Sequence, residues 1–292
     1  MKNIFYFIFV LIASSCLFSC TDVDDTLKEP MLIVKFNFDA SQARLGNQGQ
    51  PTLQTTGHGV QTPIINSISA HYLELATDEN TQFGDGSIIY KGAETTLGGT
   101  PAIDFDQAKI VGPDETFLEI PLSQLKAGSY QWMRASISYA NFQINVRKDA
   151  QYKATTVASF IGFSNYLGTT TIGNAIFPVN ANKPQGYWQF AVNDDPYSVS
   201  GQSPANSTTF PNPMFVTSPM PAGVYAISGK FDTPLIITGL EKFDVTITLI
   251  LSINKSFDWK ETNTPNGAFE PLNGETIFDT GFRGLHPTFE KL

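Results

Sequence analysis

FDVTITLILSIN, residues 243–254, contains the most regular alternation of apolar and polar side chains in the chain. Apolar residues stand at every second position: Phe243, Val245, Ile247, Leu249, Leu251 and Ile253. A period of two is typical of a β-strand that turns one face to a core and the other to solvent. We therefore expect a long central strand here, with one face buried.

A second alternating run, MLIVKFNFD at residues 31–39, opens the part of the chain that we expect to fold. Other strand candidates, bounded by turn-forming residues, are residues 64–75, 88–90, 117–122, 131–139, 142–146, 152–166, 186–192 and 276–278. No segment has a sustained helical period. The sequence therefore predicts an all-β fold, an antiparallel β-sandwich with long loops at residues 41–63 and 193–221.

The composition agrees with a single β-sandwich domain over residues 31–292. Of the 292 residues, 41% are hydrophobic and 15% are charged, and the 23 Phe, 23 Gly and 18 Pro favour strands and turns over helices. The net charge of −9 argues against a nucleic-acid partner, because phosphates repel an acidic surface. The two cysteines are Cys16 and Cys20, so we expect no disulfide in the domain.

The first residues predict an export signal. Lys2 precedes an apolar run at residues 4–12, which is shorter than the roughly 20 residues of a membrane-spanning helix. Leu17-Phe18-Ser19-Cys20 resembles the lipobox of bacterial lipoproteins. The resemblance implies a signal peptide at residues 1–19 and acyl chains, palmitate among them, on Cys20. A secreted protein with a chance cysteine at this position is the alternative.

Residues 20–30 are predicted to be an acidic tether, because TDVDDTLKEP has little apolar area to bury. The tether resembles the surface-export signal of Bacteroidota lipoproteins. This resemblance implies attachment to the outer membrane and display on the cell surface, with the periplasmic leaflet as the alternative.

The three histidines are candidate metal ligands, because imidazole suits copper or zinc. His58 is predicted in a Gly-flanked loop, His71 on the core face of a strand, and His286 in the tail. None of them has a His-x-His or His-Glu-x-x-His spacing, so structural or surface roles are preferred.

A family resemblance bears on the metal question. Residues 32–38 and 68–75, with Ile120-Pro121-Leu122 and Ala127-Gly128-Ser129-Tyr130, resemble uncharacterised Bacteroidota lipoproteins. More distantly they are similar to the methanobactin-associated copper-binding β-sandwich proteins, which implies copper as the one candidate cofactor. The resemblance does not assign a copper ligand to any particular residue.

Tyr187 with Trp188, and Trp259, are candidates for stacking on sugar rings, although core packing is the preferred interpretation. No nucleophile elbow, phosphate loop or dinucleotide fingerprint occurs. We therefore expect a non-catalytic, lipid-anchored protein of the cell envelope whose loops bind an unknown ligand or envelope protein. The alternatives are a copper-binding lipoprotein and a glycan-binding or glycan-degrading surface protein.

Overall fold

The computed structural model describes residues 29–44, 50–208, 217–221, 223–262, 266–282 and 284–292. Strands make up 57% of these residues and no α-helix occurs among them, so the predicted all-β class is confirmed. The helical turns are short 3-10 segments: η1 (Phe105–Gln107), η2 (Leu122–Gln124) and η3 (Pro271–Asn273). The predicted signal peptide, Cys20 and most of the predicted tether lie outside the described residues.

No helix within the described ranges is long and apolar enough to cross a bilayer.

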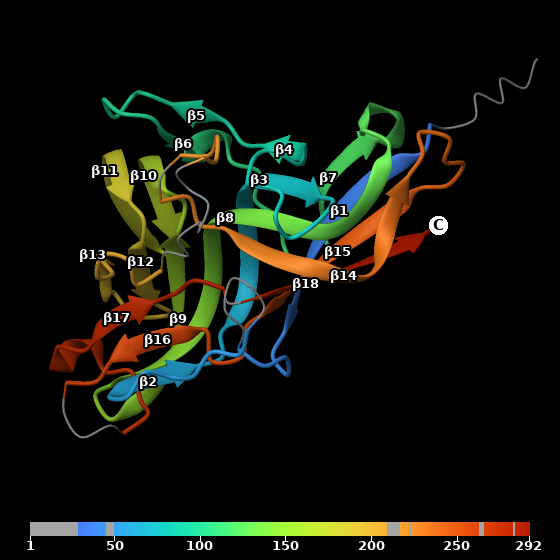
Figure 1. Ribbon diagram of the computed structural model, residues 1–292. Coiled ribbons are helices and arrows are strands. Elements are labelled where there is room, and N and C mark those ends of the chain that lie inside the picture. Colours follow the sequence, from blue (N-terminus) through green and yellow to red (C-terminus); the bar gives the residue numbers. More distant parts are fainter. Residues whose placement is uncertain (1–28, 45–49, 209–216, 222, 263–265, 283) are drawn as a thin grey trace, which may run out of the picture.

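The largest sheet has the strand order β13-β12-β9-β8-β3-β4, with β14 also paired to β8 (Figure 1). Its strands are β3 (Ile64–Ala76), β4 (Ser87–Lys91), β8 (Gly128–Lys148), β9 (Gln151–Phe160), β12 (Tyr187–Val192), β13 (Ser198–Gln202) and β14 (Ile227–Ile237). The 21-residue β8 pairs with β14 near its start, with β3 along its middle and with β9 toward its end. Because of this length, β8 connects the two ends of the molecule.

A second sheet, β18-β15-β1-β7, contains both alternating runs of the sequence. Its strands are β1 (Met31–Asp39), β7 (Thr116–Pro121), β15 (Val245–Ser252) and β18 (Leu285–Lys291). The run at 243–254 forms β15, which lies between β18 and β1, so the predicted central position is confirmed. β1 and β15 are parallel, with Leu32 opposite Val245. This parallel pair is an exception within the predicted antiparallel sandwich: most of the chain separates the two strands, so no short turn imposes a direction.

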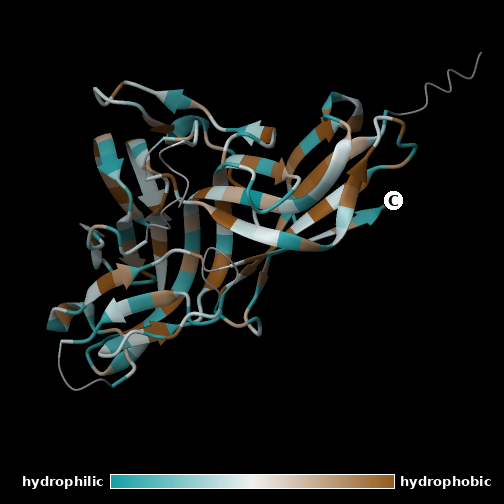
Figure 2. Ribbon diagram, in the orientation of Figure 1, coloured by the Kyte–Doolittle hydropathy of each residue, from teal (hydrophilic) through white to brown (hydrophobic). Residues whose placement is uncertain are grey.

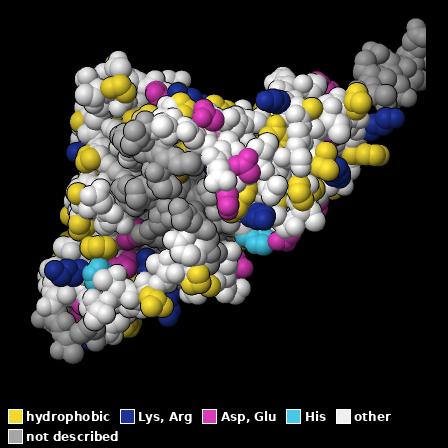
Figure 3. Space-filling model, in the orientation of Figure 1, with side chains coloured by type: hydrophobic (Ala, Val, Ile, Leu, Met, Phe, Trp, Pro, Cys, Tyr) yellow, Lys and Arg dark blue, Asp and Glu magenta, His cyan; other side chains and the backbone are white. Residues whose placement is uncertain are grey.

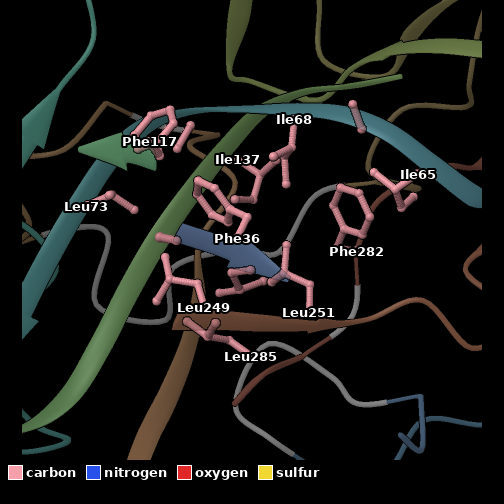
Figure 4. Close-up of a cluster of buried hydrophobic side chains, with 14 of the residues drawn as sticks. Phe36, Ile65, Ile68, Leu73, Phe117, Ile137, Leu249, Leu251, Phe282 and Leu285 are labelled. Carbon is pink, nitrogen blue, oxygen red and sulfur yellow. The ribbon is translucent and has the colours of Figure 1, made fainter. Parts of the chain in front are cut away.

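The two sheets share one apolar core, as expected for a β-sandwich. Hydropathy alternates along the strands (Figure 2), and the apolar side chains of β1, β3, β8 and β15 point toward one another between the sheets (Figure 4). Phe36 is fully buried and meets the ring of Phe117 edge to face, with the centroids 5.1 Å apart. Leu249 and Leu251 on β15 are fully buried in the same core.

Two smaller sheets complete the fold. One has the order β11-β10-β6-β5 and comprises β5 (Glu94–Thr95), β6 (Ala102–Asp104), β10 (Ser164–Ile172) and β11 (Ala175–Pro184). The other has the order β17-β16-β2 and comprises β2 (His58–Gln61), β16 (Phe257–Lys260) and β17 (Thr276–Asp279).

The structure corrects several predicted boundaries. The predicted loops at 41–63 and 193–221 contain β2 and β13, and the predicted strand at 152–166 is divided between β9 and β10. β11 was not predicted at all. β11 and β13 are edge strands whose residues are all exposed or only partly buried, and β11 contains two prolines, which edge strands tolerate. Such strands lack the buried apolar face that identifies a strand in the sequence.

Candidate functional site

The β2–β16–β17 sheet brings together polar residues from distant parts of the chain. In its register, His58 lies opposite Lys260, and Asp258 lies opposite both Val60 and Asp279. Side chains alternate between the two faces of a strand. Trp259 is therefore directed into the core, where it is fully buried, while Asp258 is directed to the other face.

A glycine allows this sheet to form. The indole of Trp259 packs directly over Gly59, and a Cβ atom added to Gly59 would lie 2.2 Å from the ring. Only a residue without a side chain fits at this position. The close approach fixes the register that places His58, the residue before Gly59, beside Asp258.

A histidine–aspartate pair is the first element of the site. His58 Nδ1 donates a hydrogen bond to Asp258 Oδ1 at 2.6 Å, and the side chains are only 8% and 2% exposed. The ring of His58 also meets Phe278 edge to face, with a centroid distance of 4.5 Å. Because Nδ1 is the donor to the carboxylate, Nε2 keeps a lone pair that can accept a hydrogen bond or ligate a metal.

An arginine and a second carboxylate complete what we call the His58 cluster: Arg44, His58, Asp258 and Asp279. The guanidinium of Arg44 lies 3.7 Å from Asp258 Oδ2 and 3.7 Å from Asp279 Oδ2, and Arg44 is 11% exposed. Asp279 Oδ1 accepts the backbone N–H of Gly281 at 2.8 Å. Buried carboxylates held by a cation and by N–H donors form a fixed polar arrangement, since leaving any one of them unpaired is costly.

The described residues complete neither a hydrolase triad nor a metal site around His58. A histidine and an aspartate are two members of a hydrolase triad, but no serine or cysteine side chain within the described ranges hydrogen-bonds to His58. Nor do the described residues contain a group of three or more His, Cys, Asp or Glu side chains that could hold a metal ion. The cluster holds the imidazole of His58 in one orientation.

The structure does not bring the three predicted metal ligands together, since each histidine has its own carboxylate partner. His58 is on a strand and not in the predicted loop. His71 is fully buried on β3, where its Nε2 lies 3.0 Å from Glu94 Oε1, in agreement with the preferred core role. Burial lowers the pKa of His71, although the Glu94 carboxylate opposes the shift. His286 is on β18 and not in a tail, and its Nε2 lies 3.8 Å from an Asp232 oxygen.

The candidate sugar-stacking aromatics are mostly enclosed. Trp259 is fully buried, and Tyr187 is 7% exposed with the Lys183 ammonium 4.8 Å from its ring centroid. Trp188 is partly buried against Gly201. Of the three rings, that of Trp188 is therefore the most open to solvent.

Arg44, Asp258 and Asp279 were not identified as site residues from the sequence. Arg44 is more than 200 residues from the two aspartates in the sequence, and no local spacing connects the three. A group of three glutamates next to this sheet, Glu261, Glu270 and Glu275, was not identified from the sequence either.

Glu275 carries a strongly shifted pKa. Burial raises the pKa of Glu275 to about 7, and the charges of Glu261 and Glu270 add to the effect. The backbone N–H of Glu270, which donates to Glu275 Oε2 at 2.6 Å, opposes it. Arg147 lies 3.5 Å from Glu270 and partly neutralises the group.

A cavity of about 180 Å³ lies elsewhere, between the turn after β3 and the start of β8. Thr77, Asp85, Ser87 and Lys126 supply polar groups, and Tyr130 lines one wall. Typical small-molecule sites have volumes of about 300–1,000 Å³, so this cavity is too small for a drug-sized ligand.

We predict that His58 and Asp258 are energetically coupled. In a double-mutant cycle of His58→Ala and Asp258→Asn, the coupling energy should be about 1–3 kcal/mol, because the pair is buried and hydrogen-bonded. The matched control is His286→Ala with Asp232→Asn. That pair is 3.8 Å apart with side chains 42% and 83% exposed, and it should give about 0.5 kcal/mol or less. Equal coupling in the two cycles, measured by urea unfolding, would contradict the geometry.

Glu275→Gln should change how stability depends on pH. The folded-state pKa of about 7 lies above the ordinary value of 4.5, so the folded protein holds this proton more tightly than the unfolded chain. Stability is therefore lost as pH rises from about 4.5 to about 7, and the glutamine variant avoids this loss. Across this pH range, the free energy of unfolding of the variant should rise relative to that of wild type by on the order of 1–3 kcal/mol.

The measurement is urea unfolding of both proteins between pH 4.5 and 8. Glu290→Gln, at an exposed glutamate on β18, controls for the loss of one negative charge. If the unfolding free energies of the variant and of wild type change in parallel at every pH, the Glu275 carboxyl is not buried as described.

Comparison of the chain with protein-family models, with curated proteins and with solved structures gave no match.

Proposed function

We propose that the protein is a lipid-anchored, non-catalytic binding protein of the bacterial outer membrane that presents the His58 cluster to a ligand or an envelope protein. The observation that carries this proposal is that the start of the described chain and the sheet with the His58 cluster lie at opposite ends of the fold. The described chain begins at Glu29, next to β1, whereas β2, β16 and β17 lie at the opposite end of the molecule (Figure 1).

The end near Glu29 is tied firmly to the sandwich. The carboxylate of Glu29 accepts a hydrogen bond from Ser123 Oγ, and the backbone N–H of Met31 donates to Asp244 Oδ1 at 2.8 Å. A lipid on Cys20 would therefore hold the start of β1, an inner strand of the second sheet, near the bilayer. The opposite end, with β2, β16 and β17, would then be held away from the bilayer, as a display function requires.

The opposite end has the chemistry of a recognition surface. Histidine, cationic and acidic side chains lie side by side on the surface over β16 and β17 (Figure 3). Beneath them the buried carboxylates and Arg44 hold His58 in one orientation. Groups that are oriented before binding lose less entropy when a ligand binds, and this favours recognition.

Copper is a second candidate ligand, because one observation favours it. Metal-ligating histidines commonly donate their other ring N–H to a carboxylate, as His58 does to Asp258. The remaining ligands would have to come from outside the described residues or from a partner, since no group of three forms within them.

Cys20→Ala should release the protein from the membrane fraction, because a domain without acyl chains lacks the anchor. The measurement is cell fractionation with incorporation of labelled palmitate. Cys16→Ala is the matched control, since a signal peptide of residues 1–19 removes Cys16 and the variant should stay in the membrane. Membrane retention of the Cys20→Ala protein would refute the anchor.

Metal analysis separates the two ligand candidates. If copper is the ligand, protein purified without added metal and then titrated should bind about one copper per chain. His58→Ala should lose this binding and His286→Ala should keep it. If the wild-type protein binds no copper on titration, copper is excluded as the ligand, and the proposal of another ligand or an envelope protein remains.

A further inference from the structure

The loop between β14 and β15 exposes large apolar side chains at one end of the molecule. Ile236 is 53% exposed, Leu240 83% and Phe243 66%. We call these three residues with the loop at 238–244 the β14–β15 tip. Figure 3 shows hydrophobic side chains beside cationic ones at this end. Single exposed apolar residues are common on soluble proteins, but several on one short loop mark an interaction surface.

Internal hydrogen bonds define the shape of the tip. Glu241 Oε1 accepts the backbone N–H of Thr238 at 2.5 Å and its hydroxyl at 2.8 Å. The N–H of Leu240 donates to Thr238 Oγ1 at 3.1 Å, and Gly239 adopts a positive φ of 75° that suits glycine. The loop therefore holds Leu240 outward in a preformed turn.

The tip lies where the chain enters the fold. Asp244, the residue after Phe243, accepts the N–H of Met31. Cys20 and Glu29, the first described residue, are nine positions apart, with eight residues between them. Nine fully extended steps of the chain span at most about 32 Å. Acyl chains on Cys20 would hold Glu29 within that distance of the bilayer, and the tip lies beside this end of the fold.

Both signs of charge surround the apolar residues of the tip. Lys242 lies between Leu240 and Phe243, Lys291 lies opposite Val245 in the register of β15 and β18, and both are exposed. Glu241 accepts hydrogen bonds from Thr238, Asp244 accepts one from Met31, and Glu290 is exposed beside Lys291. The exposed apolar side chains match the acyl region of a bilayer interface, and the two lysines can contact anionic headgroups.

We propose that the β14–β15 tip inserts Leu240 and Phe243 into the bilayer that carries the lipid of Cys20. The inference rests on the proposed function, because the anchor supplies the proximity. This second contact fixes the orientation of the domain and turns the His58 cluster away from the membrane. A bilayer is favoured over a protein partner because the anchored segment enters the fold beside the tip.

The test places a fluorescent probe at the tip. With Cys16 removed and Cys20 acylated, Phe243→Cys has a single free thiol, which is labelled with an NBD fluorophore. The full lipidated protein is reconstituted in phosphatidylethanolamine–phosphatidylglycerol vesicles with or without doxyl-labelled lipid. Ile176→Cys is the matched control, because Ile176 is 68% exposed on β11 at the far side of the molecule.

Doxyl lipid should quench about half or more of the emission at position 243 and about a tenth or less at position 176, since interfacial side chains lie about 5–10 Å deep. Leu240→Ser in the Phe243→Cys protein should reduce the quenching at least about twofold, because Leu240 is the member of the inserted apolar pair that remains in this variant.

Three other outcomes are distinguishable. Protein that floats with the vesicles but is not quenched at position 243 overturns the inference and leaves the anchor intact. Protein that does not float shows that the proposed function itself has failed. A probe at 243 that doxyl lipid does not quench, and that is also shielded from aqueous iodide, places a second copy of the chain on the tip and overturns the bilayer assignment.

Discussion

Backbone pairing along β8 is the constraint on which the rest of the structure depends. This one strand pairs with β14, β3 and β9 in turn, and the second sheet packs on its core face through residues such as Ile137. A sandwich without disulfides must obtain its stability from packing, and a strand that runs through the whole core connects distant parts of that packing. The entry of the chain at β1 and the polar sheet at β2, β16 and β17 are therefore held on one body.

The polar sheet shows how a buried charge cluster is tolerated in such a body. Arg44 lies between two carboxylates, and one of these, Asp258, also accepts a hydrogen bond from His58 Nδ1. Each charged or polar group in the cluster forms an ion pair or a hydrogen bond with a neighbour, so these contacts offset the cost of removing the groups from water. These contacts hold the ring of His58 in one orientation, and the proposed recognition role uses this rigid support.

The sequence was informative wherever the signal is local. The alternation at 243–254 and 31–39 predicted two strands of the core, and the flanking apolar residues indicated a core role for His71, because periodicity reports burial directly. Edge strands such as β11 and β13 were missed or assigned to loops, since neither has a buried apolar face. The parallel pairing of β1 with β15 and the meeting of Arg44 with Asp258 could not be predicted, because contacts across 200 residues leave no pattern in one sequence.

The central claim is that β8 makes the end of the molecule at β1 and the end at β2, β16 and β17 a single rigid unit. Native-state amide hydrogen exchange along β8 tests it most directly. Amides of residues 132–137, near β14, and of residues 142–146, near β9, should exchange through the same global opening, with free energies equal within about 1 kcal/mol. A difference of several kcal/mol between these two groups would show that the halves unfold separately, and would contradict the account.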